Sequence, residues 1–158
     1  MMYGRGERCL TRRYYAEHLG SDVSDHPRWE GGDHIASYNI APGLCPWMIT
    51  LNHGEPLFLG TRWGYRTPAE VIENNKPWIN ARIEKALTGR YFRHMFREGR
   101  AIVPAGGWYE WTVEEGRKQP WFITLKADQP IFMAGLTNYK PFVKQEAEVG
   151  FVIVTQDA

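Results

Sequence analysis

The sequence predicts an α+β fold in which mixed or antiparallel sheets curl into a barrel-like core with a few flanking helices. Three observations favour this class: seven segments have strand character, no strand–helix unit repeats, and one long helical segment is present. A doubly wound parallel sheet would need strands and helices in alternation. With 158 residues, 43% of them hydrophobic, the chain is expected to form a single domain over residues 1–158.

The N-terminal third begins with a short predicted helix over residues 11–19. Thr11 is a suitable N-cap, Gly20 follows the last turn, and three side chains are expected to face inward: Tyr14, Tyr15 and Leu19. Residues 46–51 and 56–65 are predicted strands. The segment before them, Tyr38-Asn39-Ile40-Ala41-Pro42-Gly43, predicts a turn, because Pro-Gly favours a tight reversal, and it could also line a site.

Two further helices are predicted in the middle of the chain. Thr67 is an N-cap, Pro68 occupies the first helical position, and Glu70 can close a capping box, so a short helix is expected to end near residues 74–75. Helical spacing returns over residues 84–98 and stops at Gly99. The apolar side of this long helix is expected to consist of Leu87, Tyr91, Met95 and Phe96.

Five strands are predicted in the remaining chain, at residues 100–104, 107–113, 120–125, 131–136 and 150–155. Residues 107–113 and 120–125 are predicted to form a hairpin, because the polar segment between them contains a glycine. Alternation assigns two faces: Trp108, Glu110 and Thr112 on one, and Tyr109, Trp111 and Val113 on the other, which we expect to be wholly packed.

Glu110 is the first candidate functional residue, because it is a single carboxylate within the aromatic run Gly107-Trp108-Tyr109-Glu110-Trp111. Aromatic neighbours exclude water, which disfavours the ionised form and suits a carboxyl to proton transfer near neutral pH. The alternative is structural. Tryptophan-rich strands usually build core, and an isolated glutamate in one is often an ion-paired or rim residue.

A second candidate group lies in Trp78-Ile79-Asn80-Ala81-Arg82-Ile83-Glu84. In an extended segment Asn80, Arg82 and Glu84 lie on one side and present an amide, a guanidinium and a carboxylate to one ligand. Arg82 could then hold a phosphate with Glu84 fixing its orientation. Alternatively, this is a strand-to-helix corner in which Glu84 supports the start of the helix.

Basic residues concentrate in two segments. Residues 1–13 and 82–100 together hold ten of the 19 basic residues and three of the 18 acidic ones, although the net charge is only +1. If the two segments converge, they form a phosphate-binding surface. If they do not, the second is a solvated helix face.

Other functional classes are disfavoured. No apolar run is long enough to span a bilayer and the first residues lack the apolar stretch of a secretion signal, so a cytoplasmic protein without membrane contact is expected. Cys9 and Cys45 would then be reduced. No cysteine or histidine spacing indicates a metal site, and we expect neither metal nor cofactor.

Six blocks in order resemble the SOS response-associated peptidase family, the abasic-site processing proteins. The blocks span nearly the whole chain and are Gly4-Arg5, residues 38–43, Trp63-Gly64-Tyr65, residues 80–84, residues 107–111 and Gln129-Pro130-Ile131-Phe132-Met133-Ala134-Gly135-Leu136. The resemblance implies a sensor of abasic sites in single-stranded DNA. In the family, removal of the initiator methionine exposes a cysteine whose amine and thiol trap the sugar aldehyde as a thiazolidine.

The resemblance also implies roles for particular residues. The family's active-site asparagine matches Asn80 and its glutamate matches Glu110. Its DNA-contacting arginines match Arg5, Arg82 and Arg90, within the two basic segments. We further expect Asn39, Pro42 and Trp78 to contact DNA, and Glu84 and Trp108 to support the site. The protein is expected to be a cytoplasmic monomer that associates with the nucleoid when DNA is damaged.

The chain departs from the family pattern at two positions. Tyr3 occupies the place of the nucleophilic cysteine, and a phenol cannot close a thiazolidine. The family's catalytic histidine lies beyond the strand that matches residues 150–155, and the chain stops at Ala158 before such a segment. We therefore expect either a fragment of a longer product or a degenerate copy.

Three hypotheses remain open at this stage. The first is an active family member, with autopeptidase, hydrolase or lyase-type chemistry, that binds single-stranded DNA and forms a reversible Schiff base through its terminal amine. The second is a DNA-binding module without covalent chemistry. The third is a structural remnant, such as a phage-related copy, against which the retained Asn80, Arg82 and Glu110 argue.

Overall fold

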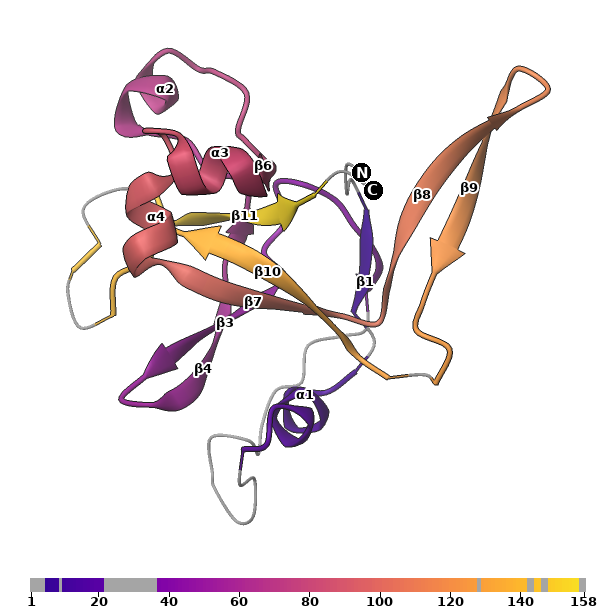
Figure 1. Ribbon diagram of the computed structural model, residues 1–158, viewed down its shortest axis with the longest axis horizontal. Coiled ribbons are helices and arrows are strands. Elements are labelled where there is room, and N and C mark those ends of the chain that lie inside the picture. The colour runs from indigo at the N-terminus through magenta and orange to yellow at the C-terminus, as the bar shows by residue number, and fades with distance from the viewer. Residues whose placement is uncertain are drawn as a thin grey trace.

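Strands form two curved sheets in the computed structural model, and short helices lie around the larger one (Figure 1). The structure describes residues 5–8, 10–21, 37–127, 129–141, 144–145 and 148–156. Pairing is mostly antiparallel, with parallel pairing only at two short strands among the described residues. The predicted α+β class, with mixed sheets curled around a core and a few flanking helices, is confirmed.

The larger sheet has seven strands in the order β4-β3-β7-β10-β11-β5, with β6 pairing beside β11. Their bounds are β3 (Trp47–Asn52), β4 (Glu55–Gly60), β5 (Arg62–Trp63), β6 (Asn80–Arg82), β7 (Arg100–Ala105), β10 (Ile131–Thr137) and β11 (Gly150–Thr155). The single strand predicted over residues 56–65 is wrong, because the chain breaks at Thr61. Thr61 donates its amide to Pro46 and so redirects the chain from β4 into β5.

The smaller sheet has four strands in the order β2-β1-β8-β9. They are β1 (Gly6–Arg8), β2 (Ser37–Ile40), β8 (Gly107–Glu114) and β9 (Arg117–Ile123). Strand β8 follows β7 after the bend at Gly106, so the chain passes directly from one sheet into the other. The β8–β9 hairpin projects away from the remainder of the molecule at the right of Figure 1.

Two apolar clusters pack on opposite faces of β11. Phe151 and Ile153 belong to one cluster, whereas Val152 belongs to the other, as expected for a strand whose successive side chains alternate. The first cluster lies between the sheets and consists of Ile40, Met48, Trp63, Ala101, Val103, Phe151 and Ile153. The second lies under the helices and consists of Tyr65, Ala81, Ala86, Phe92, Met95, Leu136 and Val152.

The helix predicted over residues 84–98 is two helices, so the prediction of one long helix is wrong. They are α3 (Ile83–Thr88) and α4 (Arg93–Glu98). Gly89 ends α3 with an extended backbone at a point where a Cβ would lie 2.5 Å from the carbonyl oxygen of Lys85. The break turns Leu87 outward, leaving it 50% exposed rather than on the apolar side. Gly99 does follow the end of α4, as predicted.

The two other helices begin where the sequence indicates. In α1 (Arg12–His18) the Thr11 side chain accepts from the amide of Tyr14, and Tyr15 is buried against Trp47 and Phe132. The prediction of which residues face inward is only partly correct. Tyr14 and Leu19 are half-buried, and Ala16 is the second buried residue of the helix. In α2 (Pro68–Ile72) the capping box between Thr67 and Glu70 is present.

The β8–β9 hairpin is tighter than predicted. Glu115 and Gly116 both have positive φ, at 50° and 77°, and form a two-residue turn that brings β9 forward to Arg117. The predicted division of β8 into two faces agrees with the register, but the packing of the second face is wrong. Trp111 is 44% and Val113 72% exposed, because the hairpin extends beyond the core.

Candidate nucleic-acid interface and active site

Glu110 lies in the middle of β8 and is half-buried. Its Oε1 atom is enclosed and has no hydrogen-bond partner among the described residues. An enclosed carboxylate oxygen without a donor is costly, since it has lost water without gaining a replacement. This atom is therefore available to accept a hydrogen bond from a bound molecule.

Strand β1 places the beginning of the described chain beside Glu110. The amide of Tyr109 donates to the carbonyl of Arg5 over 3.1 Å, and Gly6 is paired with Trp108. Because the two strands are antiparallel, following β1 toward the N-terminus leads along β8 toward Glu110. Tyr3, the predicted position of the nucleophile, lies outside the described residues.

Arg5 is held by a residue that was also predicted to contact DNA. Its Nη1 donates to Oδ1 of Asn39 over 2.8 Å, joining β1 to β2 through side chains as well as backbone. Beyond β2, the predicted turn is present: the amide of Leu44 donates to Ala41, and Gly43 has a φ of 94°. Pro42 lies in this turn and is half-buried.

Asn80 reaches the same region from the other sheet. It begins β6, which runs parallel to β11 with Asn80 opposite Ile153. Ile153 also lines a small apolar cavity of about 20 Å³ together with Arg5 and Trp108. The amide oxygen of Asn80 is enclosed. Both sheets therefore contribute predicted site residues around one part of β11.

Trp78 is held by Glu70, which the sequence indicated only as a helix-capping residue. The indole nitrogen of Trp78 donates to Oε1 of Glu70 over 3.2 Å, while Tyr91 and Thr67 donate to Oε2. Trp78 also exchanges two backbone hydrogen bonds with Tyr65. The side chain is nevertheless 51% exposed, so this network fixes an aromatic surface that faces solvent.

The hydrogen bonds to Glu70 determine its charge. Burial opposes its ionisation, but hydrogen bonds from Tyr91, Thr67 and Trp78 outweigh burial and lower the pKa from 4.5 to about 2. Burial, followed by the hydrogen bond to Glu70, raises the pKa of Tyr91. Glu70 is therefore a carboxylate and Tyr91 a neutral phenol at neutral pH.

The other predicted residues of this region are exposed, but their arrangement differs from the extended one. Arg82 ends β6, and Glu84 lies in the first turn of α3, so the side-by-side alignment of Asn80, Arg82 and Glu84 is wrong. The helix begins at Ile83, which ends the two-residue alternation. Glu84 at this position agrees with the structural alternative, in which it supports the helix start. Arg90 is exposed in the connection between α3 and α4.

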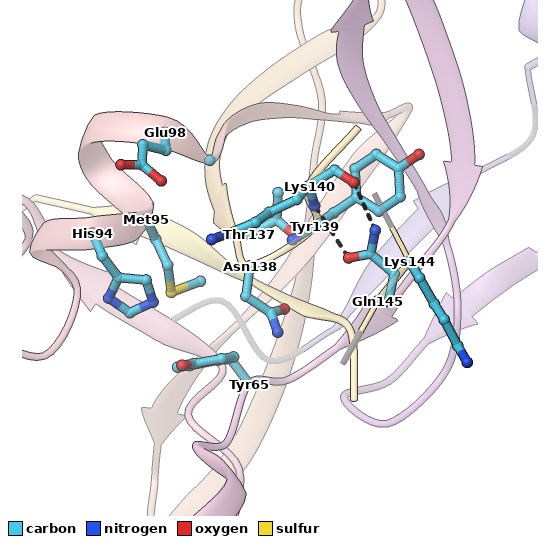
Figure 2. A pocket seen from close by; sticks show the side chains of 11 residues that line it. Tyr65, His94, Met95, Glu98, Thr137, Asn138, Tyr139, Lys140, Lys144 and Gln145 are labelled. Carbon is cyan, nitrogen blue, oxygen red and sulfur yellow. Dashed lines mark hydrogen bonds between the residues drawn. The ribbon is translucent and has the colours of Figure 1, made fainter. Parts of the chain in front are cut away.

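A separate cavity of about 450 Å³ lies between α4 and the connection from β10 to β11. Figure 2 shows His94 and Glu98 on one side and Lys140 and Lys144 on the other, with Tyr65 below. Gln145 exchanges two hydrogen bonds with the backbone of Lys140 and closes this end of the cavity. None of the predicted site residues lines it. No sequence pattern indicates this cavity, because its residues come from distant segments.

Metal-binding clusters and membrane-spanning helices are both absent from the described part of the chain. Within residues 5–156, apart from the segments that the structure does not describe, no group of three or more His, Cys, Asp or Glu side chains is arranged to hold a metal ion. No helix in the described part of the chain is long and apolar enough to cross a membrane. Cys45 is a free, exposed thiol, and Cys9 lies outside the described residues.

Comparison with known proteins decides the family. The family model of the SOS response-associated peptidases (SRAP) matches residues 2–158. The chain belongs to the SRAP family. Abasic site processing protein YedK of Escherichia coli is 37% identical over 161 residues, which cover 99% of this chain and 68% of YedK. Abasic site processing protein YobE of Bacillus subtilis is 35% identical over 66% of this chain and 49% of its own length.

Two solved structures are similar to this chain in fold. A phage-related protein of Bordetella bronchiseptica has a TM-score of 0.74 and 28% identity, covering 97% of this chain and 68% of that protein. A protein of Bacteroides thetaiotaomicron, at 24% identity and a TM-score of 0.71, shares the fold. The SRAP chain described here thus spans about two thirds of YedK and half of YobE.

Proposed function

We propose that this SRAP protein binds single-stranded DNA containing an abasic site and that its terminal amine condenses reversibly with the sugar aldehyde. The observation that carries the proposal is the hydrogen bond from Tyr109 to Arg5, which brings the start of β1 next to Glu110. Glu110, whose enclosed oxygen has no partner among the described residues, then lies one residue along β8 from this hydrogen bond. The names of the relatives YedK and YobE support DNA with abasic sites as the substrate class.

The proposed reaction needs one amine and one proton donor. In a chain processed before Tyr3, the terminal amine adds to the aldehyde carbon of the ring-opened sugar and forms a carbinolamine. Glu110 protonates the hydroxyl, which leaves as water while the nitrogen lone pair forms the C=N bond, and the carboxylate then takes the proton from nitrogen. A terminal amine has a pKa of roughly 7.7 to 8.0, so a useful fraction is neutral at physiological pH.

Tyrosine at position 3 makes this linkage reversible. A cysteine could close a five-membered ring through its thiol, whereas the phenol of Tyr3 cannot reach the imine carbon in such a ring. The imine therefore remains open to hydrolysis. We propose that the protein shields the lesion transiently and then returns the aldehyde.

The DNA contacts in the proposal come from three arginines and one aromatic side chain. Arg5, Arg82 and Arg90 would neutralise phosphates, and Trp78 would stack on a base. Asn39 orients the guanidinium of Arg5 through its 2.8 Å hydrogen bond. The enclosed amide of Asn80 would hold a hydroxyl of the sugar.

Reductive trapping tests the covalent step. The protein is incubated with a single-stranded oligonucleotide carrying one abasic site, with and without borohydride, and then resolved on a denaturing gel. We expect a shifted band only with reductant, and none with a tetrahydrofuran analogue that lacks the aldehyde. Glu110→Gln should reduce the yield of trapped product while leaving affinity for the analogue intact. A band that survives without reductant would contradict the reversible linkage.

A second candidate function is a non-covalent single-stranded DNA module, favoured by the absence of cysteine at position 3. It predicts retention of the oligonucleotide on a native gel with no trapped band under any condition. Failure to retain single-stranded DNA at low salt contradicts both candidates.

Restoring the cysteine tests whether the remaining site residues support a stable crosslink. Tyr3→Cys, in a protein whose N-terminus is cut immediately before residue 3, should give a band that is stable without reductant if Asn80 and Glu110 are competent. The mass of the protein confirms the cut. No stable band from this variant would contradict the role given to the two site residues.

A further inference from the structure

We propose that Trp121 is a stacking surface for the base next to the lesion, on the face of the β8–β9 hairpin that carries Glu110. This inference rests on the proposed function and extends it to a residue that neither the sequence patterns nor the relatives single out. Trp121 lies directly opposite Glu110 in the antiparallel register. Directly opposite residues project from the same face of a sheet and lie within about 5.5 Å at their Cβ atoms.

The indole of Trp121 is oriented before any ligand binds. Its Nε1 donates to Oγ1 of Thr112 over 3.0 Å, and Thr112 in turn donates to Glu114 over 2.9 Å. The ring is therefore fixed along the hairpin in the direction of the tip. Pre-orientation lowers the entropy lost when a ligand binds.

Half of the Trp121 side chain remains uncovered despite this fixed position. It is 52% exposed, which leaves a large apolar surface in contact with water. Every nucleobase has an apolar face, so stacking on such a ring is favourable and tolerates any sequence. At an abasic site the neighbouring base lacks a stacking partner on one side, and an aromatic ring next to the reacting carboxyl can replace it.

Charge at this end of the hairpin offers little attraction for phosphate. The turn and its flanks carry Glu114 and Glu115 against Arg117 and Lys118, all exposed. These charges nearly cancel, so the interaction that this face provides is stacking rather than ion pairing. The affinity contributed by Trp121 should therefore be insensitive to salt.

The opposite face of the hairpin provides a matched control. Trp111 is similarly exposed, at 44%, but lies opposite Pro120 and on the other face from Glu110. A general effect of removing an exposed tryptophan would appear in both variants. A stacking role beside Glu110 would appear only at Trp121.

The experiment measures affinity for single-stranded oligonucleotides in which tetrahydrofuran replaces the abasic sugar, so that no covalent step occurs. Trp121→Ala should bind about 5- to 100-fold more weakly than the wild type. The loss of affinity in Trp121→Phe should be smaller, because a smaller ring still stacks. Trp111→Ala should bind like the wild type. The salt dependence should be unchanged in Trp121→Ala, in contrast to Arg5→Ala, where one phosphate contact is lost.

Removing the neighbouring base tests the contact from the DNA side. Two oligonucleotides each carry a second tetrahydrofuran, one on the 5′ side of the first and one on the 3′ side. One of the two should bind the wild type more weakly than the oligonucleotide with a single analogue. Trp121→Ala should show no such difference. Melting temperatures of the three variants establish that each is folded, and Trp121→Phe keeps the test valid if the alanine variant is unstable.

Four results would overturn the inference. Equal affinities of the wild type and Trp121→Ala would refute the role of Trp121 and leave the proposed function intact. If the wild type fails to bind the oligonucleotide at low salt, both the role of Trp121 and the proposed function are refuted. If the wild type self-associates in sedimentation and Trp121→Ala does not, the ring belongs to an interface between copies of the chain. Equal losses in Trp111→Ala and Trp121→Ala would also contradict the assignment.

Discussion

The guanidinium of Arg5, the residue just before β1, donates a 2.8 Å hydrogen bond to the side-chain oxygen of Asn39 in the neighbouring strand β2. Both residues are candidates for DNA contact, and the hydrogen bond gives them different roles. Arg5 supplies the positive charge, whereas Asn39 orients the guanidinium that carries it. The two contributions can be separated by the salt dependence of binding.

We expect Arg5→Ala to reduce the slope of log affinity against log salt by about 0.7, as for the loss of one phosphate contact on a single strand. Asn39→Ala should weaken binding about two- to tenfold without changing the slope, because the charge remains and only a net hydrogen bond of about 1 kcal/mol is lost. Fluorescence anisotropy at several salt concentrations measures both quantities. A changed slope in Asn39→Ala would contradict the orienting role.

The carboxylate of Glu70 should make the folded state sensitive to acid. Its pKa is lowered to about 2, whereas the unfolded chain has an ordinary value near 4.3. The unfolded state therefore takes up the proton first, so the stabilisation is complete above about pH 5 and is lost as the pH falls toward 2. Glu70→Gln should flatten the decline in the free energy of unfolding between about pH 5 and 3.

Urea unfolding at a series of pH values measures this decline. Glu73, which is exposed just after the same helix and whose side chain accepts a hydrogen bond from Asn75, supplies the control. Glu73→Gln should retain the wild-type pH profile. Identical profiles for wild type and Glu70→Gln would show that the four donors do not stabilise the carboxylate in solution.

Gly107 is predicted to be intolerant of any side chain. A Cβ there would lie 2.5 Å from Phe122 and 2.7 Å from the backbone oxygen of Ile123, so strand β9 would have to shift. We expect Gly107→Ala to cost roughly 1–3 kcal/mol of unfolding free energy. Gly60→Ala is the control, because the nearest atom to its Cβ is the Cys45 oxygen at 3.8 Å. Equal costs for the two variants would refute the steric argument.

The ion pairs of Glu148 should contribute little to stability. Glu148 bridges Arg62 and Arg66, and although burial opposes ionisation, these two arginines lower its pKa. Its side chain is 37% exposed, so solvent screens the attraction. We expect Glu148→Gln to reduce the unfolding free energy by less than about 1 kcal/mol. A larger loss, measured by thermal or urea unfolding, would mean that the bridge orders the connection between β10 and β11.

Local sequence signals predicted those elements whose cause is local. Thr67, Pro68 and Glu70 specify a helix start through contacts within four residues, and the capping box is present. The same reasoning failed over residues 84–98, where apolar spacing predicted one helix. Apolar spacing carries no information about the extended backbone of Gly89, where an added Cβ would clash with the Lys85 carbonyl. That backbone conformation separates α3 from α4.

The sequence by itself determined the helix caps, most of the longer strands and the order of the family blocks, because alternation, capping and turn chemistry act over a few residues. It did not predict β1 or β2, and it merged β4 with β5. Only the tertiary structure decided that β1 pairs with β8, that Asn80 lies beside β11 in the larger sheet, and that Trp121 lies opposite Glu110. Strand order and register depend on contacts between distant segments, and no short-range pattern encodes them. The candidate site is made of such contacts.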